Sequence, residues 1–316
     1  AAMDAARPGR SLRPHVKAFK STELARRLEN DGHPAFCAAT PREIEGLARA
    51  GVGDDLLLAN ESLDVARLGE LVADPSVEAT ITVAVDSDMV LDAAIGGGVR
   101  SVLIDIDVGL PRCGCDVETG ERLAERARSA GLEVRGVMGY EGHLMMVPTE
   151  ERRLAKVEAS MALLLRAHAE VGGDIISGGG TGTYDVNTWV NEIQAGSYCL
   201  MDTHYATLEI PFRIGMDVLA SVVSVSAKGW AVVDAGLKAF GMDHGLPTWP
   251  DGELRFCSDE HATLTNPTAD GTRLAVGDRV RMQTAHIDPT IAKHERMWVV
   301  DGEKVLDCWD VDLRGW

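Results

Sequence analysis

Eight short apolar runs, separated by amphipathic segments, place the strongest constraint on the fold of this 316-residue chain. Buried parallel strands are continuous apolar runs, and the helices between them make right-handed crossovers. Eight such strands close a (β/α)8 barrel. The sequence therefore predicts a TIM-like barrel over its first two thirds, with strands at 12–16, 35–38, 56–59, 81–85, 102–106, 134–138, 174–176 and 192–195.

End signals mark several of the intervening helices. The segment T-P-R-E at 40–43 is a capping box with proline at the first helical position, and Gly51 supplies the stop. A second helix is predicted from about 117 to 130, before Gly131, and a third from Thr149 to about 172. Alternating strands and helices are typical of a parallel sheet.

The pattern changes after about residue 205. Runs rich in β-branched residues at 218–225 and 230–233 are separated by Ala-Lys-Gly, which is a hairpin signal. Further strand-like runs lie at 279–283, 297–300 and 305–309. We therefore expect a barrel domain at 1–205, followed by a smaller antiparallel β domain at 206–316.

Charge and cysteine content limit the possible partners. The formal net charge of −18 argues against nucleic acid and anionic membranes, which both require a basic surface. The six cysteines contain no C-x-x-C pair, no apolar run reaches about 18 residues, and no signal peptide is visible. We expect a cytoplasmic protein with reduced cysteines. The first residues resemble the middle of a helix, so we expect the natural protein to contain residues upstream of them.

A lysine follows the first predicted strand, in the segment L-R-P-H-V-K at 12–17. Barrel enzymes carry their chemistry at the carboxyl ends of the strands. An amine that is partly desolvated there loses its proton more easily and can attack a carbonyl group. Lys17 is therefore a candidate for a Schiff base with an aldehyde cofactor, and a solvated surface lysine is the alternative.

A glycine-rich segment, S-G-G-G-T-G-T-Y at 177–184, follows the seventh predicted strand. Glycines allow close approach of the backbone to a ligand, and successive N–H groups form an anion-binding concavity. Barrels commonly bind phosphate in the loops after their last two strands. With G-S-Y at 196–198, this segment predicts a phosphate site; a flexible loop is the alternative.

Two further side chains follow the fifth and sixth predicted strands. Arg112 offers a guanidinium to an anionic ring oxygen or carboxylate, although a surface arginine explains it equally well. His143, in Y-E-G-H at 140–143, can act as acid or base near neutral pH, although a lone histidine is more often structural.

The second domain contains His286-Ile287-Asp288. On an extended segment, residues i and i+2 face the same way, so an imidazole and a carboxylate could share one divalent cation with open coordination positions. The carboxylate favours Mn²⁺ or Mg²⁺, with Zn²⁺ possible. A hydrogen-bonded surface pair is the alternative.

Nine segments in order resemble the D-threonine aldolase / D-serine dehydratase-like family, which contains pyridoxal phosphate (PLP) enzymes of fold type III related to alanine racemase. They lie between residues 12 and 290 and read R-P-H-V-K-x-x-K, L-L-L-A-N-E, V-D-V-G-x-x-R-C-G, G-Y-E-G-H-L, G-G-G-T-G-T-Y, E-x-Q-A-G-S-Y-x-x-M-D, V-V-D-A-G-L-K-A, S-D-E-H and H-x-D-P-T.

The resemblance implies an alanine racemase-like barrel plus β domain, a head-to-tail homodimer, and PLP with a divalent metal as cofactors. It assigns Lys17 to the covalent bond with the cofactor, Arg112 to its ring oxygen, and Tyr140 or Gln194 to its pyridine nitrogen. It makes His143 an acid or base near the metal, and His286 and Asp288 the metal ligands. Phosphate would be held by Gly180, Thr181, Gly182, Gly196 and Ser197.

We favour retro-aldol cleavage of a small D-3-hydroxy amino acid, resembling D-threonine, to glycine and an aldehyde. In this family a His-x-Asp pair resembles the aldolase branch, whereas a His-x-Cys pair resembles the dehydratase branch. A D-serine or D-3-hydroxyaspartate dehydratase is the main alternative, with Lys17 removing the Cα proton. An amino-acid racemase and a non-catalytic PLP carrier are the others, and neither has a use for the His286–Asp288 pair.

Overall fold

The computed structural model describes residues 2–315, which form two compact units. The first contains 2–196 and 298–315, and the second runs from Ser197 to Met297. The second unit therefore begins before the predicted boundary at 205/206, and the C-terminal segment groups with the first unit instead of the β domain. The described residues include no helix with the length and apolar character of a membrane span.

The C-terminal segment joins the first unit through contacts that no pattern in its sequence predicts. The carboxylate of Asp312 accepts hydrogen bonds from the Thr22 backbone N–H at 2.9 Å and from the Thr22 hydroxyl at 2.6 Å. Leu313 donates its N–H to the Lys20 carbonyl, and its side chain fills the space that a Cβ at Gly46 would need. These contacts fasten 311–313 to the barrel.

Seven parallel strands form the sheet of the first unit in the order in which they occur in the chain. The strands are β1 (Ala35–Ala38), β2 (Asp55–Leu58), β3 (Thr80–Val85), β4 (Ser101–Asp105), β5 (Glu133–Gly139), β6 (Ile175–Gly178) and β7 (Glu192–Ile193). Three of the first four strands, β1, β2 and β4, are completely buried, and β3 is exposed only at its first residue. This burial explains their continuous apolar sequence.

The first predicted strand, at 12–16, is an irregular segment in the structure. Leu12 bridges Ile193 of β7 and His15 bridges Cys37 of β1, both in parallel. The Cys37 N–H donates to the Pro14 carbonyl at 3.0 Å, but Pro14 has no N–H to continue a regular ladder. The segment thus pairs with both edges of the sheet and closes the barrel, which confirms the predicted fold class.

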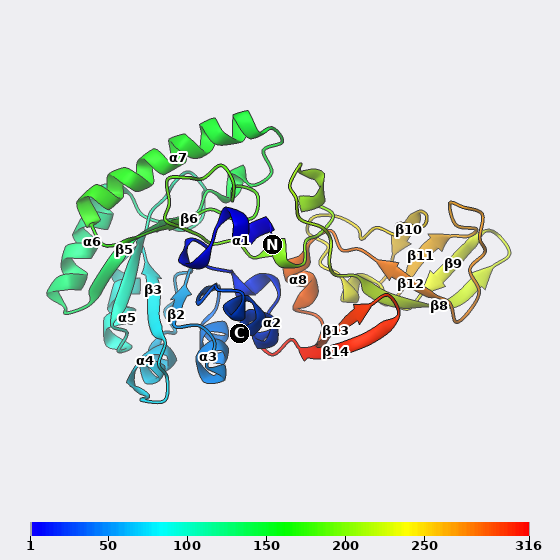
Figure 1. Cartoon of the computed structure of the whole chain (residues 1–316), viewed down its shortest axis with the longest axis horizontal. Coiled ribbons are helices and arrows are strands. Elements are labelled where there is room, and N and C mark those ends of the chain that lie inside the picture. Colours follow the sequence, from blue (N-terminus) through cyan, green and yellow to red (C-terminus); the bar gives the residue numbers. More distant parts are fainter. Residues whose placement is uncertain (1, 316) are drawn as a thin grey trace. The chain divides into compact units, whose positions relative to one another are not determined.

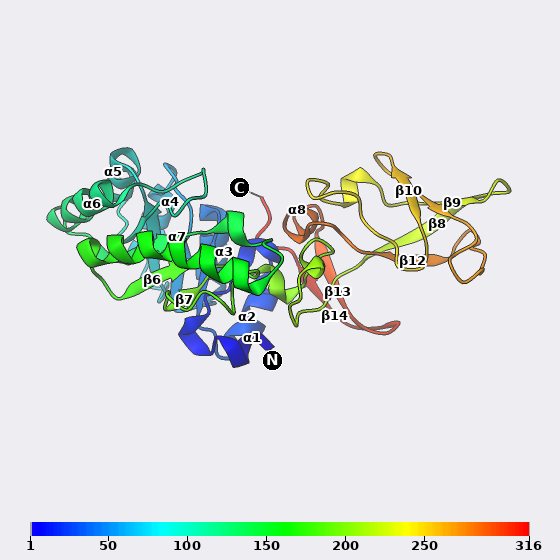
Figure 2. The ribbon, with the colours of Figure 1, turned by 90° about the horizontal axis from the view of Figure 1, so that it is seen from above.

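Helices cover the outside of the parallel strands (Figure 1). They are α2 (Thr22–Asn30), α3 (Pro41–Ala50), α4 (Ala66–Ala73), α5 (Asp88–Gly96), α6 (Val117–Ser129) and α7 (Glu150–Val171), after a short α1 (Ala2–Ala6). The predicted capping box is present at Thr40 and Glu43, and Gly51 ends α3 with φ of 61°. Figure 2 shows α7 along the barrel wall, and its bounds confirm the third predicted helix.

An ion-pair cluster fills the amino-terminal end of the barrel. Arg13, which is 2% exposed, donates to Glu192 at 2.8 Å and to Asp55 at 3.1 Å. Arg135 donates to the same Asp55 carboxylate at 2.7 Å. Burial opposes the ionisation of Asp55, but Arg135 and Arg13 outweigh it and hold the pKa of Asp55 well below its usual range.

The second unit is built on an antiparallel sheet with the order β10-β11-β9-β8-β12 (Figure 1). The strands are β8 (Val218–Ser226), β9 (Trp230–Val233), β10 (Leu254–Cys257), β11 (Ala262–Thr265) and β12 (Arg279–Met282), followed by the helix α8 (Ile287–Ile291). The predicted hairpin between β8 and β9 is present. Its core contains Val222, Val233, Phe240 and Trp249.

The last two predicted strands pair with each other. They are β13 (Arg296–Asp301) and β14 (Lys304–Asp310), and they form a separate two-stranded sheet. Short 3-10 helices occur at Gly9–Ser11, Val16–Ala18, Gly142–Leu144, Ser197–Cys199, Tyr205–Thr207 and Leu237–Ala239.

Candidate active site

The predicted site residues of the first unit all lie at the same end of the barrel. Each follows the carboxyl end of a parallel strand or of the segment that closes the barrel, and such ends meet at one mouth. They are Lys17, Arg112, Tyr140, His143, Gly180, Thr181, Gly182, Gln194 and Gly196. A cavity of about 600 Å³ lies instead at the opposite, amino-terminal end, where Arg13 and Arg135 balance Asp55 and Glu192. We regard that cavity as part of the structural ion cluster.

Lys17 lies in the 3-10 helix Val16–Ala18, immediately after the closing segment. Its side chain is partly exposed between the buried Val16 and Ala18. The ammonium of the neighbouring Lys20 forms an ion pair with the buried carboxylate of Glu43. Lys17 lies at the barrel mouth, as its position after the first predicted strand requires, and its bond to a cofactor stays a prediction.

A buried carboxylate that sequence reasoning did not assign shapes the glycine-rich loop. Glu141, which is 0% exposed, accepts hydrogen bonds from the Gly179 N–H at 3.0 Å and the Thr183 hydroxyl at 2.9 Å. It also accepts one from the Asn187 amide at 2.8 Å. All three donors lie in the segment after β6, so Glu141 sets the path of that loop. The position of Glu141 in the segment Y-E-G-H, beside Tyr140, was the feature of the sequence from which its role could have been predicted.

Two predicted phosphate-binding glycines lie where no side chain fits. A Cβ at Gly182 would collide with the Met145 carbonyl, and one at Gly196 would collide with the His15 carbonyl. The backbone therefore approaches its neighbours closely at both positions. Ser197, also predicted for the phosphate, is the first residue of the second unit and begins a 3-10 helix.

The loops after β4 and β5 carry three predicted residues, Arg112, Tyr140 and His143. The Arg112 guanidinium lies 5.4 Å from the centre of the Tyr140 ring, which is a cation–π distance. The exposed His143 ring packs against Gly109, where a Cβ would stand 3.3 Å from its Cε1 atom. Gln194 instead donates its amide to the Ser177 hydroxyl at 2.8 Å.

Acidic and thiol groups lie beside Arg112. Burial and the nearby Glu61 carboxylate raise the pKa of Asp105 well above its usual value, against an opposing effect of Arg112. Burial, with Glu61, also raises the pKa of Cys113 to about 12. Cys113 therefore remains a thiol near neutral pH, which makes it a poor nucleophile.

The predicted metal pair has a different backbone from the one expected. His286 is the residue before α8, and Asp288 lies in the first turn of that helix, so the extended i, i+2 argument does not apply. Asp202, which is 0% exposed and was not singled out, accepts hydrogen bonds from the N–H groups of Ile287 at 3.0 Å and Tyr205 at 2.8 Å. It thereby fixes the start of α8.

Two histidines and an aspartate gather around His286. The carboxylate of Asp243 accepts a hydrogen bond from His286 Nδ1 at 2.6 Å. The His244 ring stacks on the His286 ring at 4.0 Å with 9° between the planes, and His204 lies 4.3 Å from His244. Burial opposes the ionisation of Asp243, but the His286 hydrogen bond keeps the pKa of Asp243 below its usual value.

Sequence reasoning missed Asp243, His244 and His204. The dipeptide D-H at 243–244 and the triplet D-T-H at 202–204 were the available signals. All of these residues lie in the second unit, whereas Lys17, Arg112, Tyr140 and His143 lie in the first.

Comparison with known proteins identifies the family. Residues 1–204 match the family described as alanine racemase, N-terminal domain, and residues 215–300 match the putative serine dehydratase domain. The chain is 33% identical to 3-hydroxy-D-aspartate aldolase of Paracoccus denitrificans (strain Pd 1222), over 97% of this chain and 86% of that protein. It is also 33% identical to D-threonine aldolase of an Arthrobacter species, over 96% and 86%.

A dehydratase also belongs among the relatives. D-threo-3-hydroxyaspartate dehydratase of a Delftia species is 26% identical over 98% of this chain and 91% of that protein. The crystal structure of D-threonine aldolase from Filomicrobium marinum superposes with a TM-score of 0.89 and 29% identity, covering 99% of this chain and 90% of that one. The chain thus belongs to the D-threonine aldolase / D-serine dehydratase-like family, whose barrel is related to that of alanine racemase.

Proposed function

We propose that the protein cleaves D-3-hydroxy amino acids such as D-threonine by a PLP- and divalent-metal-dependent retro-aldol reaction, giving glycine and an aldehyde. One observation carries the proposal: two relatives named as aldolases of D-3-hydroxy amino acids are each 33% identical over at least 96% of this chain. The arrangement of side chains supports it independently.

The barrel mouth fits PLP. Lys17 supplies a primary amine for the coenzyme aldehyde. We propose that Gly180, Thr181, Gly182, Gly196 and Ser197 surround the phosphate, with the glycine loop held in place by Glu141. Arg112 and Tyr140 lie together, so a guanidinium and a phenol are available to the ring substituents. When bound, PLP supplies an electron sink for a carbanion at the substrate Cα.

The second unit fits a divalent cation. His286 donates Nδ1–H to Asp243, because a carboxylate can only accept, and this leaves the Nε2 lone pair for a metal. We propose His286 Nε2 and the Asp288 carboxylate as the ligands, with Mn²⁺ or Mg²⁺ favoured over Zn²⁺. A metal there would polarise the substrate β-hydroxyl. We propose that His143, exposed on its loop, accepts the proton from that hydroxyl.

Dehydration is the second candidate, because the Delftia relative is named as a dehydratase. In that reaction Lys17 would remove the Cα proton and the β-hydroxyl would leave. The aspartate in H-x-D at 286–288 favours the aldolase, since the family resemblance associates a cysteine there with the dehydratase branch. We also propose a homodimer, which the family resemblance implies, and a cytoplasmic location, where free cysteines stay reduced.

Product analysis separates the two reactions. The protein is incubated with PLP and either D-threonine or D-serine, with and without Mn²⁺, and L-threonine serves as the control. We expect glycine and acetaldehyde from D-threonine only when the metal is present, with no ammonia. Release of ammonia with a 2-oxo acid would establish the dehydratase instead, and racemised amino acid would establish a racemase.

A further inference from the structure

The second unit contains a group of potential cation ligands that shares only His286 with the proposed His286–Asp288 pair. The ligand atoms of Asp243, His244 and His286 all lie within 4.8 Å of one another. Asp243 Oδ2 is central, at 2.6 Å from His286 Nδ1 and 3.8 Å from His244 Nε2. Ligands at about 2.0–2.1 Å from a zinc ion stand at comparable separations from one another.

We propose that Asp243, His244 and His286 form a second cation site, which selects Zn²⁺ and similar borderline ions. An ion bound at this second site would prevent Mn²⁺ from binding to the His286–Asp288 pair. Two imidazoles and one carboxylate suit zinc, nickel or copper, whereas manganese and magnesium favour oxygen ligands. The Irving–Williams order points the same way, because it places Mn²⁺ below Zn²⁺ for a nitrogen-containing site.

The side chains are accessible enough to close around an ion. The side chains of Asp243 and His244 are 53% and 34% exposed, so both meet solvent and can rotate. The ion would take the place of the proton between His286 Nδ1 and Asp243. The His244 ring would tilt from its present stack on His286 so that Nε2 faces the ion.

Exclusion between the two sites follows from imidazole chemistry. A neutral imidazole has one nitrogen with a lone pair and one with a proton. Zinc at Nδ1 of His286 takes that lone pair, so the proton moves to Nε2. His286 then has no lone pair for a metal shared with Asp288. Zinc would therefore inhibit a manganese-activated enzyme, and this consequence, unlike zinc binding itself, rests on the proposed function.

Direct metal titration tests the site. Affinities for Zn²⁺ and for Mn²⁺ are measured separately, by competition with a chromophoric chelator, on the PLP-loaded protein and on His244→Ala. We expect His244→Ala to weaken zinc binding at least tenfold and to change manganese binding less than twofold. The matched control is His204→Ala, which removes a ring that lies 4.3 Å from His244 without removing one of the three ligands, and it should leave both affinities unchanged.

The inference is overturned if His244→Ala leaves zinc affinity unchanged, if it weakens manganese as much as zinc, or if His204→Ala weakens zinc equally. Asp288→Ala separates this inference from the proposed function. It should weaken manganese binding and leave zinc binding intact. Intact manganese binding in Asp288→Ala would contradict the proposed catalytic pair, while the zinc titration would still decide the second site.

Discussion

The buried carboxylate of Glu141 accepts a hydrogen bond from the backbone N–H of Gly179 at 3.0 Å, and this contact joins the loop after β5 to the glycine loop after β6. The same carboxylate holds Thr183 and Asn187. A single acidic side chain thereby sets the shape of the proposed phosphate cradle.

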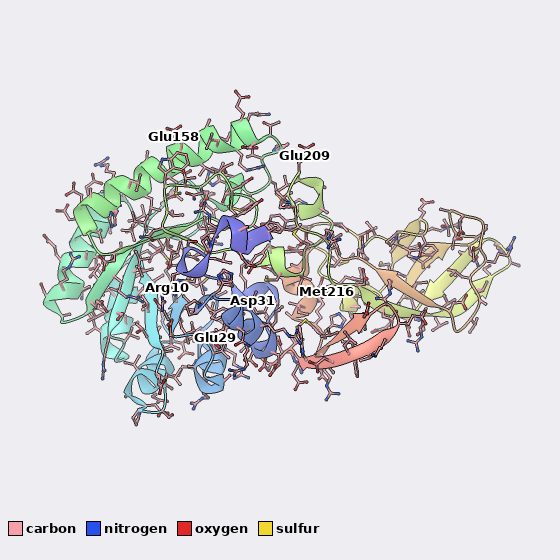
Figure 3. The ribbon with its side chains drawn as sticks, viewed as in Figure 1. Arg10, Glu29, Asp31, Glu158, Glu209 and Met216 are labelled. Atoms are coloured by element: carbon pink, nitrogen blue, oxygen red, sulfur yellow. The ribbon has the colours of Figure 1, made fainter. Side chains whose placement is uncertain are left out.

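Glu141→Gln should weaken PLP binding about tenfold, equivalent to about 1.4 kcal/mol. The amide has one acceptor oxygen and an NH2 group, so at least one of the three donors loses its partner and the loop shifts. Fluorescence titration measures the affinity. Pyridoxal, which lacks the phosphate, should bind both proteins equally. Glu158→Gln on α7, labelled in Figure 3, is the exposed control. Equal loss of pyridoxal and PLP binding would show that Glu141 does not act through the phosphate.

Lys17→Ala should abolish the visible absorbance of lysine-bound coenzyme, because Lys17 is the amine proposed to hold it. Lys20→Ala is the matched control. Its ion pair with Glu43 makes that position structural, so the spectrum should persist in that variant. An unchanged spectrum in Lys17→Ala would show that another lysine binds the coenzyme.

Asp288→Ala should reduce Mn²⁺-dependent turnover at least a hundredfold while PLP absorbance persists, because the proposed metal ligand and the coenzyme lysine lie in different units. Turnover with added Mn²⁺ and the absorbance spectrum are the two measurements. Activity that survives both this substitution and a chelator would contradict the metal assignment.

Asp55→Asn should destabilise the fold by about 3 kcal/mol at pH 7, because it removes one partner of a buried ion pair and leaves Arg135 without its carboxylate. The pKa of Asp55 is depressed in the folded state, so its contribution to stability is present above about pH 4 and is lost as the pH falls below that value. Urea unfolding from pH 7 to pH 3 measures both effects.

In that pH series, the difference in the free energy of unfolding between wild type and Asp55→Asn should become smaller as the pH falls. The matched control is Asp54→Asn, whose carboxylate pairs with Arg10 (labelled in Figure 3) while both side chains are more than half exposed. It should change stability by less than about 1 kcal/mol. If the difference in the free energy of unfolding between wild type and Asp55→Asn did not change with pH, the lowered pKa of Asp55 in the folded state would be contradicted.

Local patterns predicted most of the barrel. Seven of the eight apolar runs became regular strands, and the capping box at Thr40 started α3 as expected, because burial and capping act over a few residues. The first run became irregular at Pro14, whose missing N–H prevents a continuous ladder. The run still occupies its predicted place between β7 and β1.

Contacts between distant residues were beyond the sequence patterns. Asp243 contacts His286 although β10, β11 and β12 lie between them in the chain, and the contact of Asp312 with Thr22 joins residues near its two ends. No periodic pattern or residue spacing in the sequence predicts either contact. The extended-strand argument for His286 and Asp288 was wrong about the backbone, because the N–H of Ile287 is held by Asp202 and starts a helix there. The assignment of the two ligands remains a prediction.

The most direct measurement follows the fate of the Cα hydrogen. D-threonine deuterated at Cα is incubated with the PLP- and Mn²⁺-loaded protein, and early products are analysed by mass spectrometry. Retro-aldol cleavage breaks the Cα–Cβ bond, so we predict glycine that retains one deuterium, together with an equal amount of acetaldehyde. The appearance of 2-oxobutanoate and ammonia, with the deuterium lost to solvent, would contradict the proposed reaction.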